Sequence, residues 1–499
     1  MTSLHENDRS VLIDLAEKAM LERGLRSEYP ADVLAELATI QGPAAGSRDA
    51  LYDLRDLAWC SIDNDDSRDL DQLTVAEVLP RDRVKIYVAI ADVDELVEHG
   101  RAVDGHAQHN TTTIYTAAKI FPMLPEKLST DLTSLNPQEE RSAVVVEMVV
   151  GPDGSLEDSS IYRALVINHA KLAYADVAAW LTGQEAMPEA VLANNGLADN
   201  LRAQEGAARR MRLLRRSLGA LDLETIEGRA VFDGDTVVDL RIDERNRAKD
   251  IIEDLMIAAN GVTARYLAGR GFPSIRRVVR TPRRWGRIVD IAEGYGFDLS
   301  RSPDSRALQR FLEKVAATHP VRFPDISLAI VKLLGSGEYV ATGPGEKAPG
   351  HFGLALKDYT HSTAPNRRYT DLVTQRLLKA ALAGEAPPYD EAELDALAAH
   401  CTKQEDIVTK VERQIGKSAA ALLLDSRVGE EFDAIVSGAA PKGTWVRLLT
   451  LPVEGRLTEG FEGLDVGDRT EVRLISLDVE RGFIDFEAVP KQGRGMVLV

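Results

Sequence analysis

One short acidic segment constrains this chain more than any other feature. Five aspartates fall within nine residues, directly before the apolar run Leu73-Thr74-Val75; they are Asp63, Asp65, Asp66, Asp69 and Asp71. Two unit charges about 4 Å apart repel by roughly 4 kcal/mol at an effective dielectric constant near 20, so such a segment folds inward only around cations. Oxygen ligands without His or Cys favour Mg²⁺ or Mn²⁺ over Zn²⁺. A solvated acidic turn is the alternative interpretation.

The composition is that of a globular chain with an acidic excess. Its 499 residues carry 60 basic and 79 acidic side chains, a formal charge of −19, and 44% of the residues are hydrophobic. The two cysteines, Cys60 and Cys401, are too few for a disulfide framework or a cysteine-based zinc site. The sequence contains no apolar run long enough for a membrane span and no secretory signal at its start. We therefore expect a cytoplasmic protein that binds no membrane.

Hydrophobic periodicity predicts two unequal parts before residue 425. Residues 1–50 show helical spacing of apolar positions and end in a Gly- and Pro-containing linker at 41–47. Such a small helical domain is either a packing cap or a nucleic-acid binder resembling a helix-turn-helix or winged helix. Residues 51–424 predict one large α+β domain. Its expected strands lie at 84–90 and 143–150, and its expected helices at 246–267, 367–382 and 391–424.

The last part of the chain changes character after residue 424. Short strand-like runs are separated by Gly and Pro turns, which is typical of a small β-barrel of the OB type. These runs lie at 432–436, 443–449, 471–474 and 482–486. We predict an OB-fold domain over 425–490 and a tail at 491–499.

A second candidate site lies in Thr363-Ala364-Pro365-Asn366-Arg367-Arg368-Tyr369-Thr370-Asp371. Pro365 suits the first position of a helix, and a helix start with adjacent arginines is suited to phosphate binding. Arginines on a solvated helix face are the alternative. Gly416-Lys417-Ser418 resembles the end of a nucleotide-binding P-loop, but Val411 stands where the first glycine is required, so we expect no nucleotide cofactor.

Basic residues are concentrated in two segments despite the overall acidity. Residues 202–216 carry six arginines and residues 270–287 carry seven. Both segments are candidates for following a phosphate backbone, and a solvated charged face is the alternative for each.

Together, several ordered blocks resemble the ribonuclease II family of RNB-domain exoribonucleases. The resemblance covers about residues 51–424, and the C-terminal β-segment fits the OB-fold RNA-binding domain with which the family usually ends. The blocks are Ser61 to Gln72, Tyr87 to Val93, Ile114-Tyr115, Phe121 to Ser129, Ser134 to Pro137, Glu253 to Asn260, His351 to Leu354, Ala364 to Asp371, and Val411-Glu412-Arg413.

The resemblance implies hydrolytic, processive 3′→5′ degradation of single-stranded RNA to nucleoside 5′-monophosphates. It implies Mg²⁺, with Mn²⁺ as a substitute, held by Asp63, Asp69, Asp71 and Gln72. Two metal ions would activate water and stabilise the leaving 3′ oxygen. Asp69, Asp71 and Arg367 would be catalytic, because Arg367 matches the arginine that grips the scissile phosphate.

The resemblance also assigns residues to RNA binding. We expect the protein to be a monomer. Tyr115 matches the aromatic residue that stacks on the terminal base, and such stacking contributes about 1–3 kcal/mol per base. Tyr174 and Glu253 match residues that hold the ribose and select RNA. Arg367 contacts the phosphate, and Glu412 matches a residue near the 3′ end.

Two departures from the family pattern leave alternatives open. Gln72 stands where the family has a fourth aspartate, so metal affinity should fall unless a neighbour such as Asp65 or Asp66 compensates. A catalytically weakened or silent RNA-binding member is therefore the second hypothesis. The second departure is at the start of the chain, where 50 mostly helical residues cannot contain the cold-shock domains that many relatives carry.

The predicted barrel is itself acidic, which limits how it binds RNA. Residues 425–499 contain nine basic and fourteen acidic side chains, a net charge of −5. RNA affinity in this domain must then come from a local face, for which Lys442, Trp445 and Arg447 are candidates.

Overall fold

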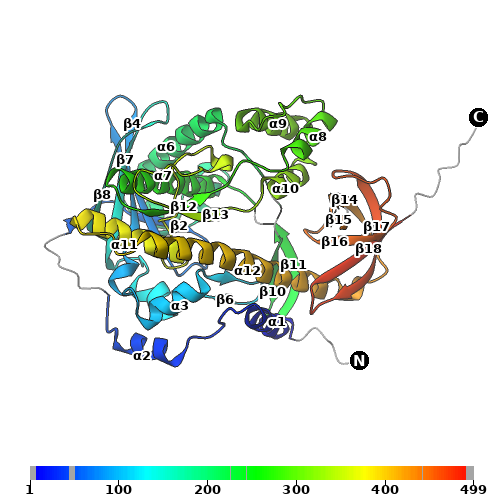
Figure 1. The fold of residues 1–499 in the computed structure, drawn as a ribbon, viewed down its shortest axis with the longest axis horizontal. Coiled ribbons are helices and arrows are strands. Elements are labelled where there is room, and N and C mark those ends of the chain that lie inside the picture. The colour runs from blue at the N-terminus through cyan, green and yellow to red at the C-terminus, as the bar shows by residue number, and fades with distance from the viewer. Residues whose placement is uncertain are drawn as a thin grey trace, which may run out of the picture.

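The computed structural model describes residues 7–43, 51–224, 226, 228–242, 244–440 and 442–489. The predicted tail at 491–499 and most of the predicted linker lie outside these residues. Figure 1 shows a large body of sheet and helices with a small β-barrel at one side. None of the helices in the described part is both long and apolar enough to cross a bilayer.

A seven-stranded sheet forms the centre of the large body, in the spatial order β1-β8-β7-β4-β3-β2-β9. β3, β4, β7 and β8 pair antiparallel, whereas β9 pairs with β2 and β1 with β8 in parallel. The predicted strands at 84–90 and 143–150 are confirmed as β4 and β7. The strands are β1 (Tyr52–Asp53), β2 (Cys60–Asp63), β3 (Gln72–Leu79), β4 (Arg83–Ala91), β7 (Glu140–Val150), β8 (Leu156–Ile167) and β9 (Ala170–Ala173).

Helices cover this sheet and share its hydrophobic core. α6 contacts β3 and β4, and α7 contacts β7 and β4. The helix predicted at 391–424 has these same bounds in the structure, and the other two predicted helices are α7 and α11 with small shifts at their ends. The helices of this body are α3 (Ala102–Asn110), α4 (Tyr174–Leu181), α5 (Glu189–Leu192), α6 (Leu197–Leu218), α7 (Arg247–Gly269), α11 (Tyr369–Ala383) and α12 (Glu391–Leu424).

Three two-stranded antiparallel sheets and a helical bundle, which lies in sequence between β12 and β13, complete the large body. The bundle has its own core around Trp285 and Phe311. It contains α8 (Trp285–Gly294), α9 (Ser305–Thr318) and α10 (Phe323–Leu334). The paired strands are β5 (Ile114–Tyr115) with β6 (Ile120–Phe121), β10 (Gly228–Asp233) with β11 (Thr236–Ile242), and β12 (Ser274–Val278) with β13 (Glu338–Thr342).

The two N-terminal helices pack on the large body at different places (Figure 1). α1 (Asp8–Glu22) packs with α12 and the β5–β6 hairpin, whereas Val33 of α2 (Ala31–Thr39) belongs to the central core. Tyr29, which precedes α2, donates a hydrogen bond to Pro122 O at 2.8 Å. This arrangement favours the packing interpretation over the nucleic-acid binder, although the domain limit at residue 50 stays a prediction.

The predicted OB-type barrel is confirmed as a closed barrel in the order β14-β15-β16-β18-β17. Its strands are β14 (Glu431–Ala440), β15 (Gly443–Leu448), β16 (Glu454–Glu459), β17 (Arg469–Asp478) and β18 (Phe483–Ala488). The sequence pattern missed β16 because Glu454-Gly455 looks like a turn. A Cβ on Gly455 would lie 2.6 Å from Ile484 O, so this glycine lets β16 approach β18 closely.

The barrel docks on α10 through a buried ion pair. Arg447 Nε and Nη2 each donate to a carboxylate oxygen of Asp325 at 2.9 Å, and Asp325 is 1% exposed. Arg447 therefore joins the barrel to the helical bundle and does not belong to the open RNA face proposed for it from the sequence.

Candidate active site

The acidic segment connects two neighbouring strands of the central sheet. Asp63 ends β2 and Gln72 begins β3. Ser134 fixes the path between them, because its Oγ accepts a hydrogen bond from Leu70 N at 3.0 Å and donates one to Arg68 O at 2.9 Å. Asp71, just before β3, is 1% exposed. The segment thus carries one of its carboxylates into the interior, as the cation-binding interpretation requires.

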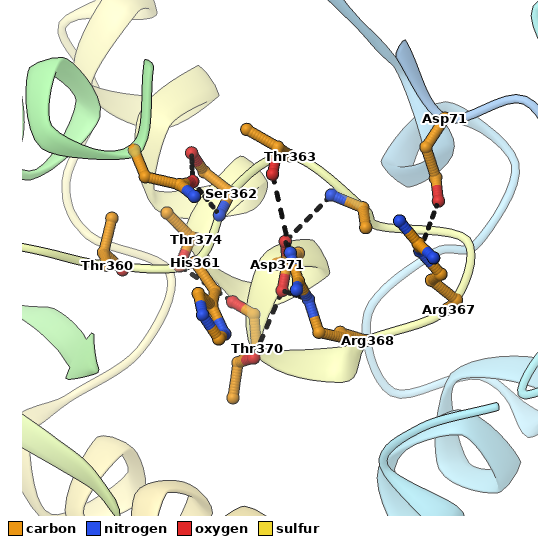
Figure 2. A network of polar contacts seen from close by, with 12 residues as sticks. Asp71, Thr360, His361, Ser362, Thr363, Arg367, Arg368, Thr370, Asp371 and Thr374 are labelled. Carbon is orange, nitrogen blue, oxygen red and sulfur yellow. Dashed lines mark hydrogen bonds and ion pairs between the residues drawn. The ribbon is translucent and has the colours of Figure 1, made fainter. Parts of the chain in front are cut away.

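Asp71 is held on one side and lacks a hydrogen bond on the other. Its Oδ1 accepts a hydrogen bond from Asn366 N at 2.9 Å, whereas its buried Oδ2 makes none with any described residue and faces Arg367 Nε at 3.4 Å (Figure 2). Burial raises the pKa of Asp71 to about 7; Arg367 opposes this rise and the charge of Asp69 adds to it. A buried carboxylate in this state is stabilised by a further cation.

Arg367 lies in the loop before α11 and is surrounded by the acids of the motif. Burial acts to lower its pKa, but Asp71, Tyr115, Asp63 and Asp69 outweigh it and the pKa of Arg367 is raised. The guanidinium therefore stays charged, and the side chain is 41% exposed, which leaves it accessible to a ligand. The helix begins later than predicted: Arg368 is its N-cap and Pro365 lies in the loop, not at the first helical position.

The donors around Asp71 suit a hard divalent cation. They are carboxylate oxygens, and Asp71 Oδ2 is a buried acceptor without a hydrogen bond. Burial likewise raises the pKa of Asp69, against the effect of Arg367. Among the described residues, no three His, Cys, Asp or Glu side chains lie close enough together to hold a metal ion, and Asp71, Asp63 and Asp69 all act on the pKa of Arg367.

Gln72 and its acidic neighbours do not form a complete four-carboxylate set. Gln72 is buried at the start of β3. Asp66 is 70% exposed and forms an ion pair with Arg229 at 3.1 Å, and Asp65 uses its backbone oxygen to accept a hydrogen bond from Lys171 Nζ at 3.1 Å. Compensation of Gln72 by Asp66, one possibility raised by the sequence, therefore does not fit the observed positions.

The segment that carries Tyr115 runs beside the loop that carries Arg367. Thr113 N donates to Arg367 O at 3.0 Å, and Tyr369 N donates to Thr111 O at 2.8 Å. Thr112 Oγ1 also donates to Arg367 O, at 3.0 Å. These bonds link the two segments, although they are more than 250 residues apart in the sequence. Tyr115 itself is half-exposed and available for stacking.

The other predicted RNA-binding residues lie at different distances from this centre. Glu412 on α12 accepts a hydrogen bond from Tyr115 N at 2.9 Å, so it holds the residue predicted to stack. Tyr174 directly follows Ala173, which pairs with Asp63 in the β2–β9 register. Burial and then the charge of Asp63 raise the pKa of Tyr174. Glu253 lies on α7 with its carboxylate 3.9 Å from Arg245, and within the described residues no contact joins it to Asp71 or Arg367.

Many arginines of the two basic segments form ion pairs within the protein. On α6, Arg212 and Arg215 both bind the buried Asp254 of α7, and Arg216 binds Asp222. In the second segment, the paired arginines are Arg277 with Glu405, Arg280 with Glu338, and Arg287 with Asp465. The pairs of Arg212, Arg215 and Arg277 join elements of the fold, so these arginines do not form a continuous phosphate track. In the second segment Arg270, Arg283 and Arg284 are exposed, as the solvated-face alternative expects.

Sequence reasoning gave no role to two residues that shape the site, Asn366 and Asp371. Asn366 donates its backbone N–H to Asp71, and its side chain accepts a hydrogen bond from Thr133 Oγ1 at 2.6 Å. Asp371 is fully buried and binds both Arg368 and Ala364 N. The sequence signal that could have indicated Asp371 is an acidic residue in the first helical turn, shortly after two arginines.

Comparison with known proteins agrees with this architecture. A match to the RNB domain covers residues 51–384, and a match to the RNase II-type exonuclease C-terminal S1 domain covers residues 430–489. This chain belongs to the RNase II/R family of exoribonucleases. The RNB match alone spans more than half of the sequence and includes the acidic motif, Tyr115 and Arg367.

Relatives from the RNase II/R family align with most of this chain. It is 32% identical to Ribonuclease R of Aquifex aeolicus, over 94% of this chain and 69% of that protein. It is 29% identical to Ribonuclease R of Escherichia coli, over 88% of this chain but 57% of that protein. The apo form of Mycoplasma genitalium RNase R has the same fold, with a TM-score of 0.84, 23% identity, and coverage of 97% of this chain and 78% of that one.

Proposed function

We propose that this chain is a hydrolytic, processive 3′→5′ exoribonuclease that degrades single-stranded RNA to nucleoside 5′-monophosphates. The observation that carries the proposal is the pairing of Asp71 with Arg367: the buried Asp71 Oδ2, which makes no hydrogen bond within the described residues, faces an accessible guanidinium. This pair offers a cation site and a phosphate-binding group side by side, as cleavage of a phosphodiester requires.

Asp63, Asp69, Asp71 and Gln72 would hold the metal, Mg²⁺ with Mn²⁺ as a substitute. When bound there, two metal ions would supply Lewis-acid stabilisation of the phosphate and lower the pKa of the attacking water. Hydrolysis then adds water to phosphorus and breaks the bond to the 3′ oxygen of the preceding nucleotide. Gln72 contributes a neutral oxygen, so the charge of the site is lower than four aspartates would give.

The other side chains bind and orient the RNA. Arg367 donates hydrogen bonds to the scissile phosphate and stabilises its growing negative charge. Tyr115 stacks on the terminal base, which is worth about 1–3 kcal/mol and tolerates any sequence. Glu412 keeps the backbone of Tyr115 in place. Tyr174, close to Asp63, and Glu253, on α7, are assigned to the ribose, where hydrogen bonding to the 2′-hydroxyl selects RNA.

The test is cleavage of single-stranded RNA labelled throughout its length by the purified full chain in Mg²⁺ and in Mn²⁺. We expect mononucleotides and a short end product, with no activity after chelation of the metal. Asp71→Asn is the matched inactive control. Wild-type turnover no greater than that of Asp71→Asn in either metal contradicts the proposal.

Gln72 supports one alternative, a weakened or silent RNA-binding protein. Tight RNA binding by the wild type without turnover in Mn²⁺ would favour it. The domain limits at 50, 424 and 490, the cytoplasmic location and the monomeric state stay predictions. Gel filtration with light scattering of the full chain tests the last of these.

A further inference from the structure

Two neighbouring arginines before α11 point to different carboxylates. Arg367 faces Asp71, whereas Arg368 faces Asp371 (Figure 2). Arg368 Nε donates to Asp371 Oδ2 at 2.8 Å and Arg368 Nη2 donates to Oδ1 at 2.7 Å. Asp371 is 0% exposed, so this bidentate pair is shielded from solvent on the carboxylate side.

Asp371 also closes the loop that carries Arg367. Its Oδ1 accepts a hydrogen bond from Ala364 N at 2.9 Å, seven residues earlier in the chain. Thr370 Oγ1 donates to Oδ2 at 3.3 Å, so each carboxylate oxygen has more than one donor. Asp371 lies in the first turn of α11, where the helix dipole also favours a negative charge.

The loop has a separate tether on each side of Arg367. On the C-terminal side, the backbone at 367 and 369 bonds to Thr113 and Thr111. On the N-terminal side, Ala364 is held by Asp371, and Asn366 N then reaches Asp71. Loss of the Asp371 tether therefore weakens the hold on Ala364 and on the approach of Arg367 to Asp71, while Thr133 Oγ1 still donates to the side chain of Asn366.

We propose that Asp371 is a positioning residue for Arg367: its buried carboxylate, shared by Arg368 and Ala364 N, fixes the loop so that Arg367 and Asn366 both meet Asp71. The inference rests on the proposed function only for its effect on turnover. Asp371 is fully buried and bound by Arg368, Ala364 N and Thr370, so it acts through the placement of Arg367.

The first test compares kcat and KM for Asp371→Asn on a short single-stranded RNA. A catalytic group displaced by about 1 Å can cost about 100-fold in rate, so we expect kcat to fall about 10- to 100-fold. KM should change less than about 3-fold, because stacking on Tyr115 contributes to binding independently of this carboxylate. A rise in KM at unchanged kcat overturns the proposal.

A double-mutant cycle with Arg367→Ala separates positioning from general damage. If Asp371 acts through Arg367, Asp371→Asn should lower kcat by no more than about 2-fold in the Arg367→Ala background. The full loss in both backgrounds overturns the proposal. Asp325→Asn is the matched control, since Asp325 is also buried and accepts two hydrogen bonds from one guanidinium, that of Arg447. Its effect on kcat should be independent of Arg367, so the two effects should multiply in the double variant.

Amide hydrogen exchange of the metal-free protein tests the inference without catalysis. In Asp371→Asn we expect exchange at 364–368 to accelerate at least about 10-fold while residues 373–383 of α11 keep their protection. Unchanged exchange at 364–368 overturns the proposal, and so does loss of protection along all of α11, which would mean a general structural role. If the wild-type protein fails to cleave RNA, the proposed function is contradicted. The exchange at 364–368 still tests whether Asp371 positions the loop, because that measurement does not depend on catalysis.

Discussion

Arg367 is the residue on which the candidate active site converges. Its guanidinium faces Asp71, and its backbone oxygen accepts hydrogen bonds from Thr112 and Thr113. A single residue thus connects the acidic motif to the segment that carries Tyr115. The sequence identified Arg367, Asp71 and Tyr115 separately, but their mutual contacts depend on chain segments that only folding brings together.

Gln72 gives the sharpest prediction at the residue scale. Replacing Gln72 by Asp adds a negative charge beside the proposed metal site, and one such interaction is worth about 1–4 kcal/mol at 4 Å. We expect Gln72→Asp to lower the Mg²⁺ concentration for half-maximal activity by about 10-fold, since 1.4 kcal/mol corresponds to a factor of ten. A metal titration of RNA cleavage measures this.

Asp66→Asn serves as the control for Gln72→Asp. Asp66 faces Arg229 at the surface, so its loss should leave the Mg²⁺ requirement unchanged. A larger effect of Asp66→Asn than of Gln72→Asp would mean that the acidic loop rearranges around the metal and that Asp66 enters the site.

At the scale of elements, α1 joins parts of the molecule that meet near the active site. Its apolar face packs on Val411 and Ile415 of α12 and on Ile114 and Phe121 of the β5–β6 hairpin. Polar contacts add to this, including Arg23 Nη2 donating to Gln414 Oε1 at 2.8 Å. Because α1 supports the hairpin that carries Tyr115, we expect removal of residues 1–50 to weaken the cleavage even of short RNA.

Leu12→Ala tests the role of α1 with a single change. Leu12 is fully buried in this cluster, and removing such a side chain costs about 2–5 kcal/mol. We expect the free energy of unfolding to fall by that amount in denaturant titrations. Leu21→Ala on the same helix is the control, because Leu21 is 65% exposed and its loss should cost less than about 0.5 kcal/mol. Equal costs for the two variants would argue that α1 does not pack as observed.

At the scale of the whole molecule, which has a net charge of −19, ion pairs determine which of the basic side chains are neutralised within the protein. Arginines of both basic segments are bound to acids from other elements, as in the contacts of Arg212 and Arg215 with Asp254. The barrel is fixed in the same way, through Arg447 and Asp325. These arginines, whose positive charge the sequence offered for RNA binding, thus join helices and domains instead.

The docking of the barrel provides the prediction at this scale. Arg447→Met leaves Asp325 buried without its partner, which costs about 3–5 kcal/mol. We expect a lower free energy of unfolding, and most of the loss should be recovered when Asp325→Leu is added, because the uncompensated charge is then gone. Lys332→Ala, which removes a partly exposed ion pair with Glu454, should cost about 1 kcal/mol or less. Failure of the second substitution to restore stability would contradict this account.

The sequence by itself determined the fold class, the RNase II/R resemblance, the acidic motif and the positions of most strands and helices. These depend on local patterns: alternation of apolar residues, spacing of aspartates, and Gly or Pro at turns. Where the local pattern was ambiguous, as at Gly455 in β16 and Pro365 before α11, the prediction failed.

Only the tertiary structure decided which charges are free and which are paired. Asp371 received no role from the sequence, because its importance lies in the contacts with Ala364 N and Arg368 that close a loop. Asp71 was predicted as a ligand, but the burial of its carboxylate and its ion pair with Arg367, 296 positions later in the numbering, appear only in three dimensions. The physical reason is that burial and ion pairing depend on neighbours in space, and those neighbours come from distant parts of the chain.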